Sequence, residues 1–192
     1  WETADVFTLH LEPTDPADMI SFKAGQWVYL HLLNEDGSMW ARAAYSIISA
    51  PEESATRLRL GIKVAGDFTK KASKLMPDDM VGVQGPFGVF VLPPSEGPLV
   101  IFAAGIGITP FRSMIHSLKA QNAKREVTLF YSNKTIEETA YFEEFDALAK
   151  KAEWFKPVFT LTQDEPKVWP GERGRINGEM LERHVPSLDG YT

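Results

Sequence analysis

The 192-residue sequence contains no cysteine. Without thiols the chain has no disulfide bond, no thiolate zinc site, no iron–sulfur cluster held by cysteine and no catalytic thiol. The same absence favours a reducing compartment, although only weakly, and we take the cytoplasm as the expected location.

The sequence also lacks a long hydrophobic run and an excess of positive charge. Its longest uncharged stretch near the middle, residues 97–111, has 15 residues, of which three are glycine and two are proline. A transmembrane helix needs about 20 apolar residues, so we predict no membrane span, and no signal peptide is recognisable. The 20 Lys and Arg residues are scattered and outnumbered by 26 Asp and Glu, so nucleic acid is not an expected partner. Nothing in the sequence indicates an oligomeric state.

Two kinds of catalytic site are missing as well. The four histidines, His10, His31, His116 and His184, show no metal-ligand spacing, so no metal is expected. No G-x-S-x-G turn is present, which argues against a hydrolase. The composition, 44% hydrophobic and 24% charged, is that of a folded protein, and the length is sufficient for two domains of about 100 residues.

Residues 1–95 have the pattern of short β-strands. Alternating apolar residues at 7–11 and 58–64, together with β-rich runs at 27–33 and 43–50, predict strands. One helix is predicted at residues 68–76. This half therefore favours a small antiparallel β-barrel with one inserted helix. Its predicted turns are at Asp15-Pro16, Asp36-Gly37, Ala50-Pro51 and Gly85-Pro86.

The pattern changes after a short proline-rich linker at residues 93–98. The apolar run at 99–104 predicts a strand buried on both faces. Helical spacing at 109–123 and 136–152 then alternates with strand patterns at 127–131 and 158–162. This βαβαβ order predicts that residues 96–192 form an α/β domain with a doubly wound parallel sheet.

A glycine-rich turn, Gly105-Ile106-Gly107-Ile108-Thr109-Pro110, follows the buried strand and opens the next helix. The glycines allow close approach of an anion, Thr109 suits a helix N-cap, and Pro110 suits the first helical position. Unpaired amides at a helix start favour a phosphate, so the turn predicts a dinucleotide site. A tight turn without a ligand can carry the same glycines. Pro110 stands where the common GxGxxG fingerprint has its third glycine.

The next strand ends at Ser132-Asn133-Lys134, where the ordinary dinucleotide fold has an acidic residue for the ribose hydroxyls. These side chains suit either a 2′-phosphate or an adenosine ribose, and a solvated turn explains them nearly as well. The choice between NADPH and NADH is therefore open, with a slight preference for NADPH.

Two segments of the first half form a second candidate site. Tyr45 and Ser46 are neighbours on a predicted strand and therefore face opposite sides of it. Gly66-Asp67-Phe68-Thr69 starts the helix predicted in this half, which makes the helix start a second candidate for anion binding.

Together these segments resemble the two-domain ferredoxin–NADP reductase family of flavoproteins. The resemblance implies an FAD-binding barrel, residues 1–95, and an NAD(P)-binding domain, residues 96–192. It extends in order over nearly the whole chain, through Phe22-Lys23-Ala24-Gly25-Gln26, Tyr45-Ser46-x-x-Ser49, Gly66-x-x-Thr69, Gly85-Pro86-Phe87-Gly88, Gly105-x-Gly107-x-Thr109-Pro110, Tyr131-Ser132-Asn133, Leu161-Thr162-Gln163-Asp164 and Gly171-Glu172-x-Gly174-Arg175-Ile176.

The resemblance also implies roles for individual residues. Tyr45 would stack on the isoalloxazine, Ser46 would hydrogen-bond near flavin N5, and Thr109 would lie where the nicotinamide meets the flavin. These three are the candidate catalytic residues. At the helix start, Gly66, Phe68 and Thr69 would hold the flavin pyrophosphate. The implied FAD site further includes Arg42, Ile62 and Lys63. The implied nucleotide site comprises Gly105, Gly107, Thr109, Pro110, Ser132, Asn133 and Lys134.

Two features depart from the family pattern. The family strand reads Arg-x-Tyr-Ser, its arginine pairing with the flavin pyrophosphate, but here Ala43 occupies that position and Arg42 precedes it. A shift of one residue turns a side chain to the other face, so we predict either a β-bulge at Ala43-Ala44 that restores Arg42 or weaker retention of FAD. Family members also continue beyond a segment like residues 188–192 into a strand with a Cys-Gly-Pro motif, so we expect an incomplete NAD(P) domain.

The implied function is that of an oxidoreductase that passes hydride from NAD(P)H to FAD and electrons on to a separate acceptor. Because the chain has no cysteine-held iron–sulfur cluster, the electrons leaving the flavin need a carrier outside it. Candidate acceptors are a ferredoxin, a flavodoxin, a haem, an oxygenase component, or a free ferric or flavin substrate. The alternative is a non-catalytic electron-transfer or regulatory subunit that binds flavin or nucleotide without turnover.

Overall fold

The computed structural model describes residues 1–54, 56–163 and 169–191. The chain forms two compact units, the first made of Trp1–Leu92 with Thr109–Gln121, and the second of Pro93–Ile108 with Asn122–Thr192. Asp164 of the family segment Leu161-Thr162-Gln163-Asp164 and Thr192 at the end of the sequence lie outside the described residues.

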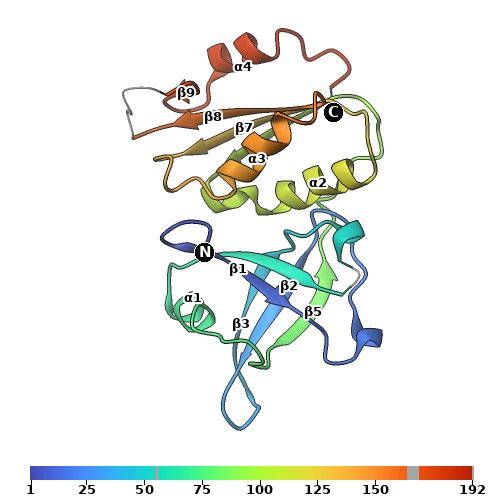
Figure 1. Ribbon diagram of the computed structural model, residues 1–192, viewed down its shortest axis with the longest axis vertical. Helices are drawn as coiled ribbons and strands as arrows, with labels where there is room; N and C mark the ends of the chain where they lie inside the picture. Colours follow the sequence, from blue (N-terminus) through green and yellow to red (C-terminus); the bar gives the residue numbers. More distant parts are fainter. Residues whose placement is uncertain (55, 164–168, 192) are drawn as a thin grey trace. The chain divides into compact units, whose positions relative to one another are not determined.

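The first unit contains two antiparallel sheets (Figure 1). One pairs β1 with β4, and the other has β2 at its centre, between β3 and β5. An isolated bridge between Ile47 and Leu60 links the two sheets, and the antiparallel architecture predicted for this half is confirmed. The strands are β1 (Val6–Leu11), β2 (Trp27–Leu33), β3 (Met39–Ser46), β4 (Leu58–Lys63) and β5 (Gly82–Phe87).

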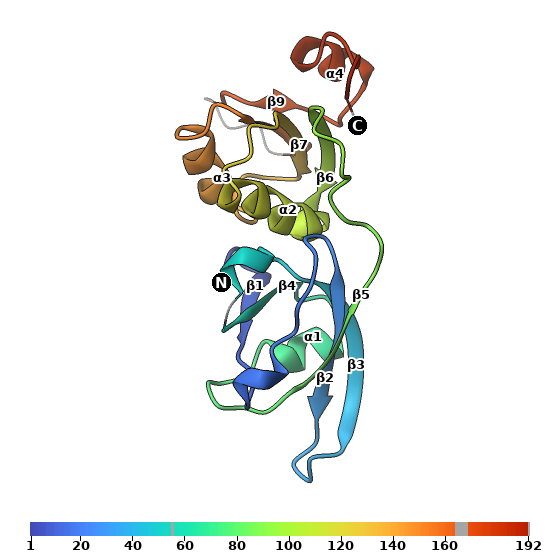
Figure 2. The same ribbon diagram turned by 90° about the vertical axis from the view of Figure 1, so that its right-hand side faces the viewer.

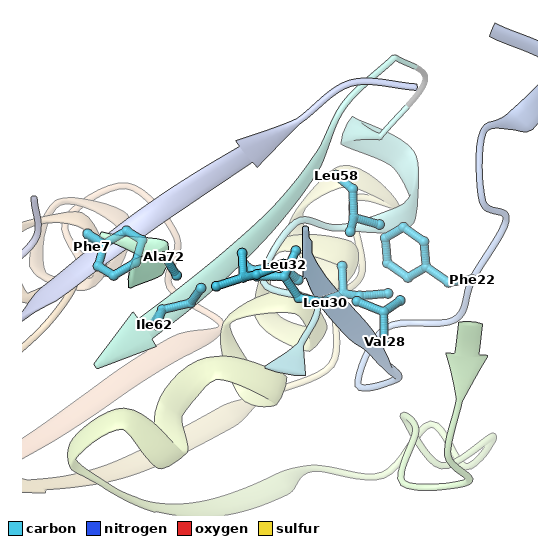
Figure 3. Packing of buried hydrophobic residues seen from close by; sticks show 10 residues of the cluster. Phe7, Phe22, Val28, Leu30, Leu32, Leu58, Ile62 and Ala72 are labelled. Atoms are coloured by element: carbon cyan, nitrogen blue, oxygen red, sulfur yellow. The ribbon is translucent and has the colours of Figure 1, made fainter. Parts of the chain in front are cut away.

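The core of this unit is built from alternate residues of facing strands. Val28, Leu30 and Leu32 of β2 are almost completely buried, and they meet Leu58 and Ile62 of β4 (Figure 3). Each such side chain contributes about 1.5–3 kcal/mol on burial. The period-two pattern in the sequence therefore marks the residues that hold the two sheets together.

Three local expectations for this unit are wrong. The inserted helix, α1 (Asp67–Ala72), ends four residues earlier than predicted, because the backbone bonds after it become tighter turns, from Lys74 to Lys71 and from Leu75 to Ala72. The strand expected at 43–50 is β3, which ends at Ser46, because Ile47 and Ile48 leave β2 and bond to β4; a short 3-10 helix (Pro51–Glu53) follows. Gly85-Pro86 is not a turn but lies within β5.

The second unit has a parallel sheet in the order β6-β7-β8-β9. Helix α3 (Phe142–Ala149) covers one face, where Phe145 contacts Tyr131, and α4 (Gly178–His184) covers the other, where Met180 packs near Phe130 (Figure 2). Helices on both faces confirm the predicted α/β architecture. The strands are β6 (Leu99–Ala104), β7 (Val127–Asn133), β8 (Phe155–Leu161) and β9 (Glu172–Arg173).

The helices of the α/β half differ in length from the expectations. The helix predicted at 136–152 is limited to α3, because Tyr141 has a φ of +61° and interrupts the helical backbone before Phe142. Helix α2 (Thr109–Ala120) begins at the predicted residue, and its residues group with the first unit. None of the helices in the described part of the chain combines the length and the apolar character needed to cross a bilayer.

Candidate functional site

The glycine-rich turn lies at the carboxyl end of β6 in the second unit, where Gly105–Ile108 form one 3-10 turn. Gly105 has a φ of +49°, a conformation that favours glycine. A Cβ placed on Gly105 or on Gly107 would have no atom within 4 Å, so open space surrounds the backbone on that side. This geometry fits the close approach of a phosphate that the sequence predicts.

Tyr131 on β7 supports this turn from inside the unit. Its hydroxyl oxygen lies 3.1 Å from the carbonyl oxygen of Gly105 and 3.3 Å from that of Ala140, and it donates its proton toward them. Burial raises the pKa of Tyr131 well above its ordinary value, so the phenol remains a donor at all physiological pH. No local signal in the sequence reveals this role of Tyr131, because Gly105 is 26 residues away along the chain.

Replacing Tyr131 with phenylalanine is expected to weaken the turn without disturbing the sheet. The change removes one hydroxyl and leaves the Gly105 carbonyl without this donor, which costs about 1 kcal/mol. We expect faster amide hydrogen exchange at residues 105–108, measured by mass spectrometry, with unchanged exchange in β8. Equal exchange at residues 105–108 in both proteins would contradict the supporting role.

The end of β7 carries the second part of the predicted nucleotide site. Asn133 is 7% exposed, and its amide nitrogen has no hydrogen bond of good geometry among the described residues, although its side chain also interacts with the hydroxyl of Tyr131. Buried polar atoms are nearly always paired, so such an atom is typical of a site that a ligand or water completes. Ser132 is half-buried and Lys134 is exposed beside it, which fits recognition of a ribose or a phosphate.

Tyr45, in the first unit, stands on β3 at the edge of its sheet. Its side chain is half-buried, packs against the core, and lies with its ring centroid 6.0 Å from that of Phe68 at an interplanar angle of 28°. Burial raises its pKa, so the ring stays uncharged. Ser46 pairs with Trp27 while Tyr45 pairs with Val28, so the two side chains face opposite sides, as predicted from the strand pattern.

Thr69 shapes the turn before α1. Its hydroxyl oxygen accepts hydrogen bonds from the amides of Ala65 at 2.8 Å and Gly66 at 2.9 Å, and the hydroxyl donates to the carbonyl of Gly66 at 2.9 Å. Thr69 therefore fixes the backbone that presents Phe68 to Tyr45. Of the predicted FAD-site residues, Gly66, Phe68 and Thr69 lie together here.

Arg42 does not lie on the face of β3 that carries Tyr45. The pairing of β2 with β3 is regular from Arg42 to Ser46, so no bulge occurs at Ala43-Ala44. Arg42 instead lies over the ring of Tyr29, with its guanidinium carbon 4.5 Å from the centroid. Because Tyr29 pairs with Ala44, the arginine is on the face opposite Tyr45. Of the two predicted alternatives the bulge is absent, so weaker retention of FAD through Arg42 is the one that stays a prediction.

Two other predicted FAD-site residues have structural roles. Ile62 is fully buried in the core of the first unit, so its side chain packs against the sheets and only its backbone is left for a ligand. Lys63 pairs with Asp5 at 3.0 Å, and this ion pair engages its ammonium group. The resemblance implies both residues, but it does not reveal which way a side chain on the strand before Gly66 points.

Helix α2 joins the remaining predicted catalytic residue to the first unit. Thr109 and Pro110 open this helix, and Thr109 is buried. Further along, Arg112 donates a hydrogen bond from Nη1 to the carbonyl of Ile48 at 2.8 Å, and Ser113 donates from Oγ to the carbonyl of Ser49 at 2.7 Å. All three predicted catalytic residues, Tyr45, Ser46 and Thr109, therefore belong to one compact unit.

A groove of about 950 Å³ lies elsewhere in the first unit. None of the predicted site residues lines it. Its lining includes four carboxylates, which disfavour a phosphate-bearing ligand. These are Glu12, Asp18, Asp78 and Asp79.

Comparison with known proteins relates both sites to one class. Residues 2–92 match the oxidoreductase FAD-binding domain, and residues 101–192 match the oxidoreductase NAD-binding domain. The fold and the two sites thus define an oxidoreductase in which an FAD-binding domain is followed by an NAD-binding domain. Within this class, the chain belongs to the ferredoxin–NADP reductase family.

Several individual proteins are similar to the chain. Ferredoxin–NADP reductase B of Sorangium cellulosum is 32% identical over 170 residues, which cover 87% of this chain and 66% of that protein. A component of the Na(+)-translocating NADH-quinone reductase of a Marinomonas species is 30% identical over 155 residues, 74% of this chain and 38% of that protein. The crystal structure of an Amycolatopsis cytochrome P450 reductase superposes with a TM-score of 0.80 at 26% identity, covering 99% of this chain and 56% of that one. The chain thus spans less than two thirds of the length of each of these relatives.

Proposed function

We propose that the chain is a flavin-dependent reductase that passes hydride from NAD(P)H to FAD and electrons on to a separate acceptor. The observation that carries this proposal is the placement of Tyr45, Ser46 and Thr109 in one unit, with the helix that bears Thr109 hydrogen-bonded to the loop after β3. The proposal assigns FAD to residues 1–95 and the pyridine nucleotide to residues 96–192.

FAD, when bound, supplies the ability to accept two electrons together and to release them singly or in pairs. The residues of the chain bind and orient it. Tyr45 offers an uncharged ring for stacking, and Phe68 supports that ring from α1. Thr69 holds the turn in which Gly66 would approach the cofactor. In the second unit, Gly105, Gly107 and Asn133 would contact the pyridine nucleotide, with Ser132 and Lys134 beside its ribose.

The acceptor is proposed to be a separate protein or domain in the cytoplasm. Because the sequence has no cysteine, a cluster held by cysteine must lie outside this chain. A ferredoxin, a flavodoxin, a haem protein or an oxygenase component would each satisfy that requirement.

The proposal is tested with the purified chain loaded with FAD under anaerobic conditions. Addition of NADPH or NADH is expected to bleach the visible flavin band, and the ratio of the two reduction rates identifies the donor. Bleaching by neither nucleotide, with FAD bound, would favour the non-catalytic electron-transfer or regulatory subunit. A chain that takes up no FAD would overturn both flavin functions.

A further inference from the structure

Three aromatic side chains form a row beside α1 in the first unit. The ring centroids of Trp40 and Phe68 are 6.2 Å apart at an interplanar angle of 20°, and those of Phe68 and Tyr45 are 6.0 Å apart at 28°. The ammonium nitrogen of Lys71 lies 4.5 Å from the centroid of Trp40. Near-parallel rings that end at a cation suit a ligand with both a planar group and a phosphate.

A β-bulge places Trp40 in this row. Leu32 pairs with Ala41 and Leu33 pairs with Met39, so Trp40 is an extra residue on β3. Tyr45 and Trp40 are five residues apart, and in a regular strand their side chains would face opposite sides. The bulge allows both rings to contact Phe68, while Trp40 keeps 41% of its surface exposed. The bulge therefore places a large ring at the surface, where it carries the ammonium group of Lys71.

The charge near this row is supplied by Lys71. Arg42, the predicted partner of the flavin pyrophosphate, is on the opposite face of β3, over Tyr29. Lys63 is paired with Asp5. Lys71 is exposed and forms no ion pair within the described part of the chain, so its charge is free for an anionic ligand.

We propose that Lys71, positioned by Trp40, binds the pyrophosphate of FAD in place of Arg42. The proposal rests on the proposed function, since it names residues of the same FAD site. The cation–π contact with Trp40 restricts the lysine before the ligand arrives, which reduces the entropy lost on binding. The ammonium then forms charge-assisted hydrogen bonds with phosphate oxygens.

The test measures the affinity of the flavin-free chain for FAD by quenching of flavin fluorescence. Lys71→Gln is expected to weaken FAD binding about tenfold to a hundredfold, the loss of one or two charge-assisted hydrogen bonds. Lys70→Gln is the matched control, because it removes the same charge from the neighbouring position. The FAD affinities of Lys70→Gln and Arg42→Gln should each stay within about twofold of that of the wild type. Lys71→Arg should keep most of the wild-type affinity for FAD.

A second ligand separates a phosphate contact from a general disturbance of the fold. Riboflavin has no phosphate, so Lys71→Gln should leave its affinity unchanged. The FAD affinity of the wild type should also fall more steeply with added salt than that of Lys71→Gln. Trp40→Ala is expected to weaken FAD binding, whereas Trp40→Phe should keep most of it.

Three results would overturn the assignment. One is an FAD affinity of Lys71→Gln that stays within twofold of the wild type. Another is a loss of FAD affinity in Arg42→Gln that is larger than the loss in Lys71→Gln. The third is an equal loss of riboflavin affinity in Lys71→Gln. In each of these cases the wild type still binds FAD, so the proposed function survives. A wild-type chain that binds no FAD would overturn the proposed function together with this site.

Discussion

Replacing Arg112 with methionine is expected to lower the free energy of unfolding of the first unit by about 2–3 kcal/mol. Arg112 is 6% exposed and donates to the carbonyl of Ile48, a residue that is itself fully buried. Methionine keeps most of the apolar stem but has no donor, so a buried carbonyl loses a hydrogen bond from a charged group. Such a loss is among the larger effects of a single substitution.

Denaturant unfolding followed by tryptophan fluorescence measures this effect. Lys119→Met is the matched control, because Lys119 lies on the same helix but is exposed, and its replacement should change the free energy of unfolding by less than about 0.5 kcal/mol. Arg112→Lys keeps a cationic donor, so its free energy of unfolding should lie between those of Arg112→Met and Lys119→Met. If Arg112→Met were as stable as Lys119→Met, the bond to Ile48 would contribute nothing to the fold.

The same bond matters for the proposed function. Ile48 follows Ser46 by two residues, and Arg112 follows Thr109 by three, so their hydrogen bond lies between two groups of predicted catalytic residues. Loss of the bond should slow the reduction of bound flavin by NAD(P)H more than it weakens FAD binding. This difference would show that α2 positions Thr109 rather than holding FAD.

Much of the fold follows from periodicity. The period-two runs predict β1 and β4, and the β-rich run at 27–33 predicts β2, because part of each strand is buried in the core of the first unit. The bounds of β6 and the helix start at Thr109 are also predicted to the residue. The predicted burial of β6 on both faces is wrong, because Phe102 is 47% exposed and only one face of the strand is buried. These signals are local, since burial and helix capping act on neighbouring residues of one element.

Other features depend on contacts between distant parts of the chain. Arg112 and Ile48 are 64 residues apart, and Tyr131 and Gly105 are 26 apart, so no spacing in the sequence reveals either pair. The bulge at Trp40 depends on the register between β2 and β3, which is set by the whole sheet. The sequence alone therefore does not reveal which face of β3 carries Arg42. The register of the sheet places it opposite Tyr45.

Replacing Gly25 with alanine is expected to destabilise the first unit by about 3–5 kcal/mol, a still larger effect than that of Arg112→Met. Gly25 belongs to the family segment before β2 and has a φ of +101°. A Cβ at this position would lie 2.3 Å from the carbonyl oxygen of Phe90 and 2.4 Å from the terminal methyl of Met114 on α2. The methionine can move aside, but Phe90 presents backbone, so the chain itself must shift.

Gly37→Ala separates the two causes of this loss. Gly37 has a φ of +81°, but a Cβ there would have no atom within 4 Å. Its replacement should cost only the backbone strain, about 1–2 kcal/mol. The difference between the two variants in denaturant unfolding therefore measures the clash with Phe90 and Met114. Equal losses of stability in the two variants would mean that Gly25 is required only for its backbone angle. We predict that Gly25→Ala loses about 2 kcal/mol more than Gly37→Ala. That excess would show that Gly25 allows the segment before β2 to pack against α2 and the segment after β5.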